Sequence, residues 1–281
     1  MAATSDVKRA IPRALAGLAR ACHPGPTIAV TTLVTVVAAS AGRDPLGCVY
    51  VGAAVLTGQL SIGWSNDAID AERDQAVARA DKPIASGLIS RRAVWTAAVI
   101  ALVACVPLSL ASGWLAGTAH LVGVIAGWAY NLRLKSSVVS WLPYAVAFGL
   151  LPSFVTLGTP PDHAWAPWWA MTATALLGIG AHLANVVPDL ADDLATGIRG
   201  WPQRLGGAAR LVAPIPLAVA TVLLVVAPAG AIGLAGWITL GVVAVLLVVI
   251  ASWRRAPFLL TIAVAAVDIV LLVLRGDALI P

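Results

Sequence analysis

Long apolar runs separated by short polar loops recur along the whole chain. The hydrocarbon core of a bilayer takes about 20 apolar residues per helix, so each run is long enough to cross a membrane. The pattern predicts nine such helices, at about residues 24–41, 46–65, 93–112, 114–131, 139–158, 165–187, 209–228, 230–251 and 256–274. We therefore expect an all-α polytopic membrane bundle of nine transmembrane helices without a separate soluble domain.

Basic side chains gather in alternate loops between these runs. Of the 18 Lys and Arg residues, only Arg43 and Arg275 lie on the side opposite to the N-terminus. Because short cytoplasmic loops are rich in Lys and Arg, we expect a cytoplasmic N-terminus and an external C-terminus. Residues 1–22 combine basic residues with apolar ones at helical spacing, which predicts an amphipathic helix along the cytoplasmic interface. Residues 23–281 are then expected to form one transmembrane domain.

Composition agrees with this interpretation and excludes a soluble protein. The chain is 60% hydrophobic and 11% charged, with a mean hydropathy of +0.91, whereas soluble domains carry about 25% charged residues. Membrane orientation explains the net charge of +5, so no nucleic-acid partner is expected, and no obligatory protein partner is evident. Arg outnumbers Lys 15 to 3, which is typical of a GC-rich bacterial genome and favours a bacterial plasma membrane.

The second predicted span continues into polar residues at helical spacing. On a continued helix Asn66, Asp70 and Asp74 lie four residues apart, and Asp67 lies three residues before Asp70, so all four project from one side. Three carboxylates on one stripe repel one another, and a cation is expected among them. Carboxylate oxygens without nearby Cys or His suit Mg²⁺ rather than Zn²⁺.

The sixth predicted span ends in a similar pattern. Asn185, Asp189 and Asp193 lie four residues apart and should share a helix face, with His182 one turn earlier. Solvated loops would explain one such cluster, but ionisable residues near membrane depth usually persist for function, and two matched clusters favour a site. The weak internal repeat predicts two four-helix pseudo-repeats plus one helix, around a central cavity open toward the cytoplasmic face.

Two acidic clusters on one membrane face suit a bound diphosphate. Mg²⁺ ions held by the clusters would neutralise a diphosphate leaving group, while an apolar cavity would hold the organic tail and shield a carbocation from water. An isoprenoid tail suits such a cavity because the substrate already dissolves in lipid.

At these residues the chain resembles the UbiA-type family of intramembrane prenyltransferases. The family's first motif, Asn-Asp-x2-Asp-x3-Asp, is matched at every position, by Asn66, Asp67, Asp70 and Asp74. Its second motif, Asp-x3-Asp before a Gly, is matched by Asp189, Asp193 and Gly197. The resemblance covers nearly the whole chain.

Three further segments are similar to the family pattern but depart from it. Lys82 stands where the family usually has Arg in a basic-Pro-Ile segment followed by Gly. Tyr130 and Lys135 are separated by four residues rather than the usual three, and His23 replaces an Arg common before the first span.

The resemblance implies a Mg²⁺-dependent prenyl transfer. The residues that would hold Mg²⁺ are Asp67, Asp70, Asp74, Asp189 and Asp193. Asn66 and Asn185 would point into the cavity as part of the catalytic set. The substrate-binding residues would be Lys82, Lys135 and Arg204 at the diphosphate, together with Tyr130 and with His182 at the acceptor. The expected partners are a prenyl diphosphate and a small lipophilic or aromatic acceptor.

Two other functions are compatible with the same residues. A terpene cyclase would ionise a prenyl diphosphate without an acceptor, but a polar stripe running inward from Asp189 would quench its cation prematurely. A cation-coupled transporter also uses pseudo-repeats and intramembrane Asp. Here the carboxylates lie at span ends beside cationic side chains, which favours an enzyme over a transporter.

Overall fold

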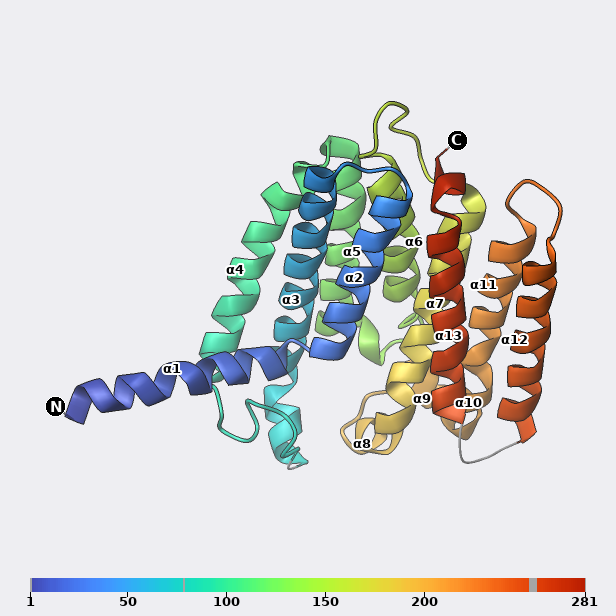
Figure 1. Ribbon diagram of the computed structural model, residues 1–281. Coiled ribbons are helices and arrows are strands. Elements are labelled where there is room, and N and C mark those ends of the chain that lie inside the picture. Colours follow the sequence, from blue (N-terminus) through green and yellow to red (C-terminus); the bar gives the residue numbers. More distant parts are fainter. Residues whose placement is uncertain (1, 78, 253–256, 281) are drawn as a thin grey trace.

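The computed structural model describes residues 2–77, 79–252 and 257–280 (Figure 1). Within these ranges the chain forms helices and turns and contains no β-strand. The all-α prediction is therefore confirmed. Arg254 and Arg255, two of the basic residues behind the orientation prediction, lie outside the described residues.

Each of the nine predicted apolar segments contains a helix. These helices are α2 (Pro24–Ser40), α3 (Pro45–Ala76), α4 (Arg91–Leu110), α5 (Trp114–Leu132), α6 (Leu142–Thr156), α7 (Trp168–Val186), α11 (Pro214–Val226), α12 (Leu234–Ser252) and α13 (Pro257–Leu274). Shorter elements connect or precede them: α1 (Ala2–Ala21), η1 (Leu134–Ser136), η2 (Val187–Asp189), α8 (Leu190–Ala195), α9 (Trp201–Leu205), η3 (Gly206–Ala208), α10 (Ala209–Val212) and η4 (Gly276–Leu279).

Fewer than nine of these helices are long and apolar enough to count as membrane spans by themselves. In the described ranges four qualify, in α3, α4, α7 with its extension, and α12. The number rises to six if two bent pairs each form one span, one of them α1 with α2, which meet at 68°. The count of nine transmembrane helices thus stays a prediction, whereas a polytopic membrane protein is the result.

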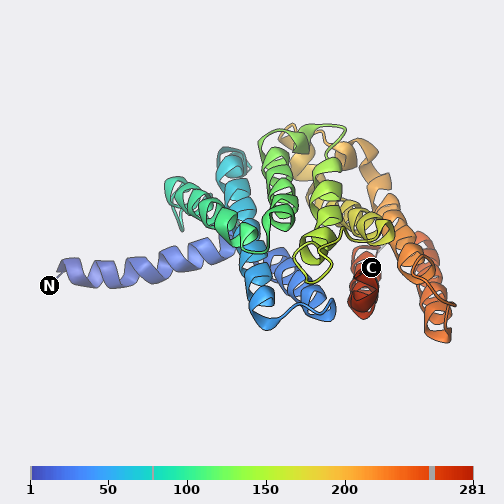
Figure 2. The same cartoon turned by 90° about the horizontal axis from the view of Figure 1, so that it is seen from above.

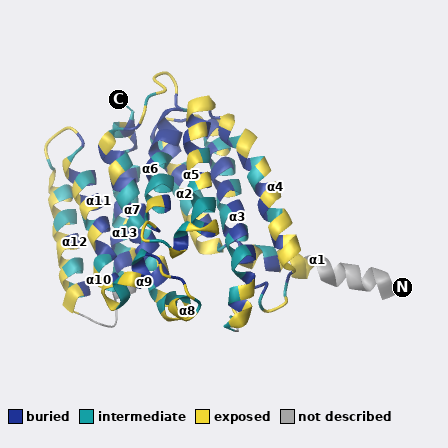
Figure 3. Ribbon diagram, turned by 180° about the vertical axis from the view of Figure 1, so that it is seen from behind, coloured by how far each residue is buried: buried dark blue, intermediate teal, exposed yellow. Residues whose placement is uncertain are grey.

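The helices pack as a ring rather than as two separate halves. Successive helices from α2 to α7 contact one another, α11 packs against α7, and α13 packs against both α11 and α2 (Figure 2). Helix α13 therefore closes the bundle against α2. Large apolar side chains on the outside stay exposed, including Val103 and Ile125 at 65% each (Figure 3). Only lipid solvates such a surface.

The two ends of the bundle differ. Helix α1 projects sideways at the end where α8 and α9 lie, and the C-terminus lies at the opposite end (Figure 1). The N-terminal helix thus shares an end with the loops that carry both acidic clusters, as the charge pattern predicted. Which end faces the cytoplasm stays a prediction.

Helix α3 extends well beyond the apolar run that starts it. Asp44 caps its N-terminus by accepting from the backbone nitrogen of Gly47 at 2.9 Å, and Pro45 occupies the first turn. Its last 13 residues contain neither Gly nor Pro, so the helix continues through Asp74. The first acidic cluster therefore lies on one unbroken helix.

Candidate active site

The three carboxylates of the first cluster share one side of α3 and are largely withdrawn from solvent. Asp67 is 1% exposed and Asp74 is 8% exposed. Lys82 Nζ lies 3.1 Å from Asp67 Oδ1, and Asp70 is paired with Lys135 and, at 3.0 Å, with Arg73. The expected cations among the carboxylates are thus present as side chains of the chain itself.

The two lysines reach this cluster from two different loops. Lys82 is the last residue of a tight turn, in which its backbone nitrogen donates to the backbone oxygen of Arg79. The guanidinium of Arg79 holds both carboxylate oxygens of Asp81 at 2.9 Å, which lowers the pKa of Asp81. Lys135 lies in η1 after α5, where burial lowers the pKa of its ammonium group and the neighbouring Asp70 opposes that shift.

The second cluster does not lie on one uninterrupted α-helix. Helix α7 ends at Val186, a 3-10 turn with Pro188 follows, and α8 begins at Leu190. Proline lacks the backbone N–H that would continue the ladder of α7, which explains the break. Asn185, predicted to point into the cavity, is exposed. The common face of Asn185, Asp189 and Asp193 stays a prediction.

The second cluster is nevertheless connected to the rest of the site. Gln203 Nε2 donates to Asp193 Oδ2 at 2.7 Å from helix α9. Arg79 lies 3.5 Å from Asp189 Oδ1 and 3.8 Å from Asp192 Oδ2. Because Arg79 lies in the loop after α3, these contacts bring the second cluster to the loop that supplies Lys82.

Aromatic side chains from α5, α6 and α7 meet at the inner edge of the site. The ring of Tyr144 stacks on His182 with centroids 4.7 Å apart, and Tyr130 meets both rings edge-on. His182 is 1% exposed, and its Nε2 lies 3.0 Å from Ser140 Oγ. The structure therefore joins Tyr130 and His182, two predicted substrate-binding residues, in one cluster.

Arg204 lies apart from these groups. Its side chain is exposed, and its Nε donates to the backbone oxygen of Arg199 at 2.9 Å. Its predicted contact with a diphosphate remains a prediction, and the structure turns the guanidinium toward its own loop.

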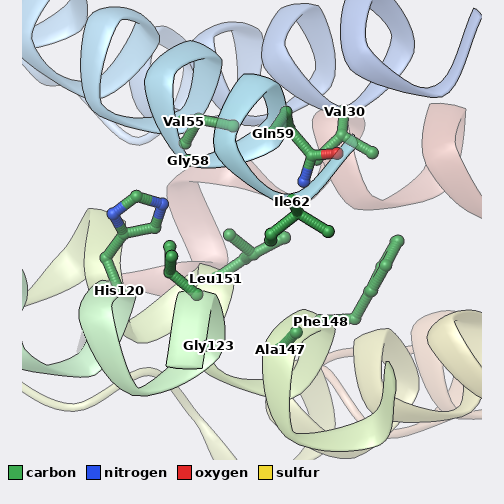
Figure 4. A pocket seen from close by; sticks show the side chains of 11 residues that line it. Val30, Val55, Gly58, Gln59, Ile62, His120, Gly123, Ala147, Phe148 and Leu151 are labelled. Carbon is green, nitrogen blue, oxygen red and sulfur yellow. The ribbon is translucent and has the colours of Figure 1, made fainter. Parts of the chain in front are cut away.

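A small, mainly apolar pocket lies inside the bundle (Figure 4). It is lined in part by the residues of α3 that precede the first cluster. Its lining comes from α2, α3, α5 and α6 and includes Val30, Ile62, Phe148 and Leu151, with Gln59 and His120 as polar members. Ile62 lies one helical turn before Asn66. The apolar pocket therefore approaches the acidic cluster along the same helix.

The carboxylates suit a hard cation that shares its ligands with a phosphate group. Among the described residues, no three His, Cys, Asp or Glu side chains are grouped closely enough to form a metal site by themselves. Mg²⁺ is commonly held by only one or two carboxylates together with substrate phosphates and water. Asp67 Oδ2 is buried without a hydrogen-bond partner in the described part of the chain, and such an oxygen needs a proton or a cation. The residues present fit Mg²⁺ in this sense.

Comparison with known proteins identifies the family. The profile of the UbiA prenyltransferase family matches residues 28–267, which is most of the chain. This chain belongs to the UbiA prenyltransferase family. The match confirms the resemblance seen in the two aspartate motifs.

Similar proteins agree with this membership in the UbiA prenyltransferase family. The bacteriochlorophyll synthase 33 kDa chain of Cereibacter sphaeroides is 38% identical over 189 residues, which cover 61% of this chain and 60% of that protein. The matched region thus spans less than two thirds of that relative.

Solved UbiA homologues share the fold. The homologue from Archaeoglobus fulgidus bound to GPP and Mg²⁺ has a TM-score of 0.70 at 18% identity, covering 94% of this chain and 99% of that one. The apo homologue from Aeropyrum pernix K1 has a TM-score of 0.68 at 18% identity, covering 89% and 98%.

Sequence reasoning missed two residues that hold the UbiA motif side chains. Gln203 binds Asp193, and Asn131 binds Asn66. Gln203 lies within a charged loop, where nothing in its spacing sets it apart. Asn131 directly follows Tyr130 at the end of an apolar helix, and its polarity at membrane depth was the available signal.

Proposed function

We propose that this protein transfers an isoprenyl group from a polyprenyl diphosphate to an electron-rich, aromatic acceptor within the membrane, with Mg²⁺ as cofactor. The observation that carries the proposal is the meeting of two carboxylate clusters with the half-buried Lys82 and the buried Lys135, next to the turn of α3 that lines an apolar pocket. The 38% identical bacteriochlorophyll synthase chain supports an enzyme of prenyl transfer. The homologue bound to GPP and Mg²⁺ supports the donor and the cofactor.

In this proposal the residues of the first cluster hold the leaving group. Asp67, Asp70 and Asp74 on α3, with Asp189 and Asp193 across the site, would hold Mg²⁺, which neutralises the charge that develops on a departing diphosphate. Lys82 and Lys135 now bind Asp67 and Asp70, and their ammonium groups lie close enough to bind phosphate oxygens when the substrate arrives.

The apolar part of the site would hold the isoprenoid chain and keep water from its cation. The pocket lined by Val30, Phe148 and Leu151 offers the apolar surface, and the ring of Tyr144 stacks with Phe148 at its edge. An electron-rich acceptor next to His182 would attack the allylic carbon. The released diphosphate or a carboxylate would then take the proton that the acceptor loses.

The decisive experiment measures product formation from a panel of radiolabelled prenyl diphosphates of different lengths. The purified protein in lipid nanodiscs is incubated with Mg²⁺, with and without aromatic acceptors. We expect diphosphate release that requires both Mg²⁺ and an acceptor, and that EDTA abolishes. Release without acceptor, accompanied by a cyclic hydrocarbon or alcohol, would show a cyclase instead.

The orientation in the membrane is part of the proposal. We propose that the end carrying α1 and both acidic clusters faces the cytoplasm of a bacterium. Single cysteines at Ser86 and Asp162, both exposed, are suitable probes because they lie in loops at opposite ends of the bundle. A membrane-impermeant thiol reagent should label intact cells at position 162 and leave position 86 unlabelled. The reverse labelling would invert the orientation.

A further inference from the structure

A buried asparagine on α5 holds the first residue of the Asn-Asp motif. Asn131 is 2% exposed. Its Nδ2 donates to the backbone oxygen of Ile62 and to Ser65 Oγ, both at 2.9 Å. Its Oδ1 accepts from Asn66 Nδ2 at 3.1 Å. Three hydrogen bonds thus connect one amide group of α5 to a single turn of α3.

These partners fix the direction in which both amide groups point. The backbone oxygen of Ile62 only accepts, so the nitrogen of Asn131 must face it. The second N–H of that nitrogen is used on Ser65, and only the oxygen remains for Asn66. Asn66 must therefore turn its nitrogen toward α5. Its own oxygen, Oδ1, does not face Asn131, and on that side His23 lies within hydrogen-bond reach of Asn66.

We propose that Asn131 is a positioning residue that holds Asn66 with its carbonyl oxygen, rather than its amide nitrogen, presented to the Mg²⁺–diphosphate group. The inference rests on the proposed function, because it assigns the direction of one group within that site. Mg²⁺ binds oxygen ligands and its bound waters donate hydrogen bonds to oxygen acceptors, whereas an N–H group pointing at the cation repels it. Asn131 itself does not touch the substrate.

The same pair of helices supplies a matched control. Trp128 Nε1 donates to Ser61 Oγ at 3.2 Å, so it also links α5 to α3 by a polar contact inside the bundle, one turn away from Asn131. This bond does not involve Asn66. Trp128→Phe therefore removes an interhelical hydrogen bond of comparable kind and leaves the direction of Asn66 unchanged.

A double-mutant cycle tests the assignment. Asn131→Ala, Asn66→Ala, the double variant and Trp128→Phe are purified in nanodiscs, and Mn²⁺ binding in the presence of inorganic pyrophosphate is measured by electron paramagnetic resonance. Removing a group that orients a metal ligand costs about 10-fold in metal affinity. We expect that loss from Asn131→Ala in the wild-type background, none in the Asn66→Ala background, and none from Trp128→Phe.

Three results would overturn the inference. The first is unchanged Mn²⁺ binding in Asn131→Ala, and the second is an equal loss in both backgrounds, which would mean a general packing role. The third is unchanged binding in both Asn66→Ala and Asp67→Asn, which would refute the metal site of the proposed function as well. Only the third result affects the proposed function, so the two failures are distinguishable.

A second variant covers the case in which Asn131→Ala does not fold. Asn131→Asp keeps the volume of the side chain and an oxygen for Asn66 Nδ2. We expect its Mn²⁺ binding to be weaker than that of wild type, because a carboxylate cannot donate to Ile62 and Ser65, but stronger than that of Asn66→Ala, because the acceptor for Asn66 Nδ2 remains. A loss as large as that of Asn66→Ala would contradict the inference.

Discussion

The two aspartate motifs lie at the same site, but the backbone that carries them differs. The first lies on an unbroken helix, α3, with Asp67 and Asp74 buried and paired cations on two of its carboxylates. The second crosses a break at Pro188, and the side chain of Asp189 is 48% exposed. Similar sequence spacing therefore produces a rigid, desolvated cluster on α3 and a cluster after α7 that is more open to solvent.

This difference in burial gives the two clusters different electrostatic environments. Burial strengthens the attraction between a carboxylate and a cation because the local dielectric is low, and exposure to water weakens it. The carboxylates of α3 are therefore the stronger ligands, while those of the second cluster depend on neighbours such as Gln203 for their position. Mutations should reveal this asymmetry.

The largest effect is expected from Asp67→Asn. Asp67 is the most buried carboxylate of the site, and Lys82 already compensates its charge. Loss of this ligand removes several kcal/mol of charge neutralisation at the leaving group, or about 1,000-fold in turnover. The rate of diphosphate release measures this effect. Asp162→Asn, exposed in a loop at the other end, is the control that should retain full activity. Near-normal turnover in Asp67→Asn would mean that the first cluster has only a structural role.

A smaller effect is expected from Gln203→Ala. The side-chain amide of Gln203 donates a hydrogen bond to Asp193 at 2.7 Å. Loss of such an orienting bond typically weakens metal binding by about 10-fold, so the Mg²⁺ concentration for half-maximal activity should rise by that factor. Gln203→Glu should raise it further, since a second carboxylate would face Asp193. If both variants respond to Mg²⁺ like wild type, the second cluster is as rigid as the first.

Physical reasons separate what the sequence predicted from what it did not. The apolar runs and the stripe on α3 follow from local periodicity, which an uninterrupted helix preserves. The 3-10 turn after α7 was not predicted, because the spacing of Asn185, Asp189 and Asp193 suggests a continuous helix whereas Pro188 interrupts its hydrogen bonds. Contacts between different helices, such as those of Gln203 on α9 and Asn131 on α5, depend on tertiary packing rather than on local spacing.

Gly200→Ala tests how closely the loops of the two halves pack. The backbone of Gly200 approaches the carbonyl oxygen of Lys135 so closely that an added Cβ would overlap it. Such crowding costs about 1–3 kcal/mol, and the thermal midpoint of unfolding should fall. Gly207→Ala is the matched control, because its Cβ would meet nothing within 4 Å. Equal midpoints for the two variants would mean that the loops are loosely packed.

The smallest effect is expected from Arg204→Ala, and it is best measured against Lys135→Ala. The resemblance to the family motifs predicts that both side chains contact the diphosphate, but their surroundings in the structure differ. Lys135 is 8% exposed and paired with Asp70, so its removal leaves that carboxylate with the more exposed Arg73 as counterion and should lower turnover at least about 100-fold. Arg204 is exposed and bonded to a backbone oxygen of its own loop. Exposed charge contacts are worth about 0–1 kcal/mol, so the KM for the prenyl diphosphate should change by less than about fivefold. A rise in that KM as large as the loss in Lys135→Ala would mean that α9, which carries Arg204, turns inward when substrate binds and brings the second cluster over the diphosphate.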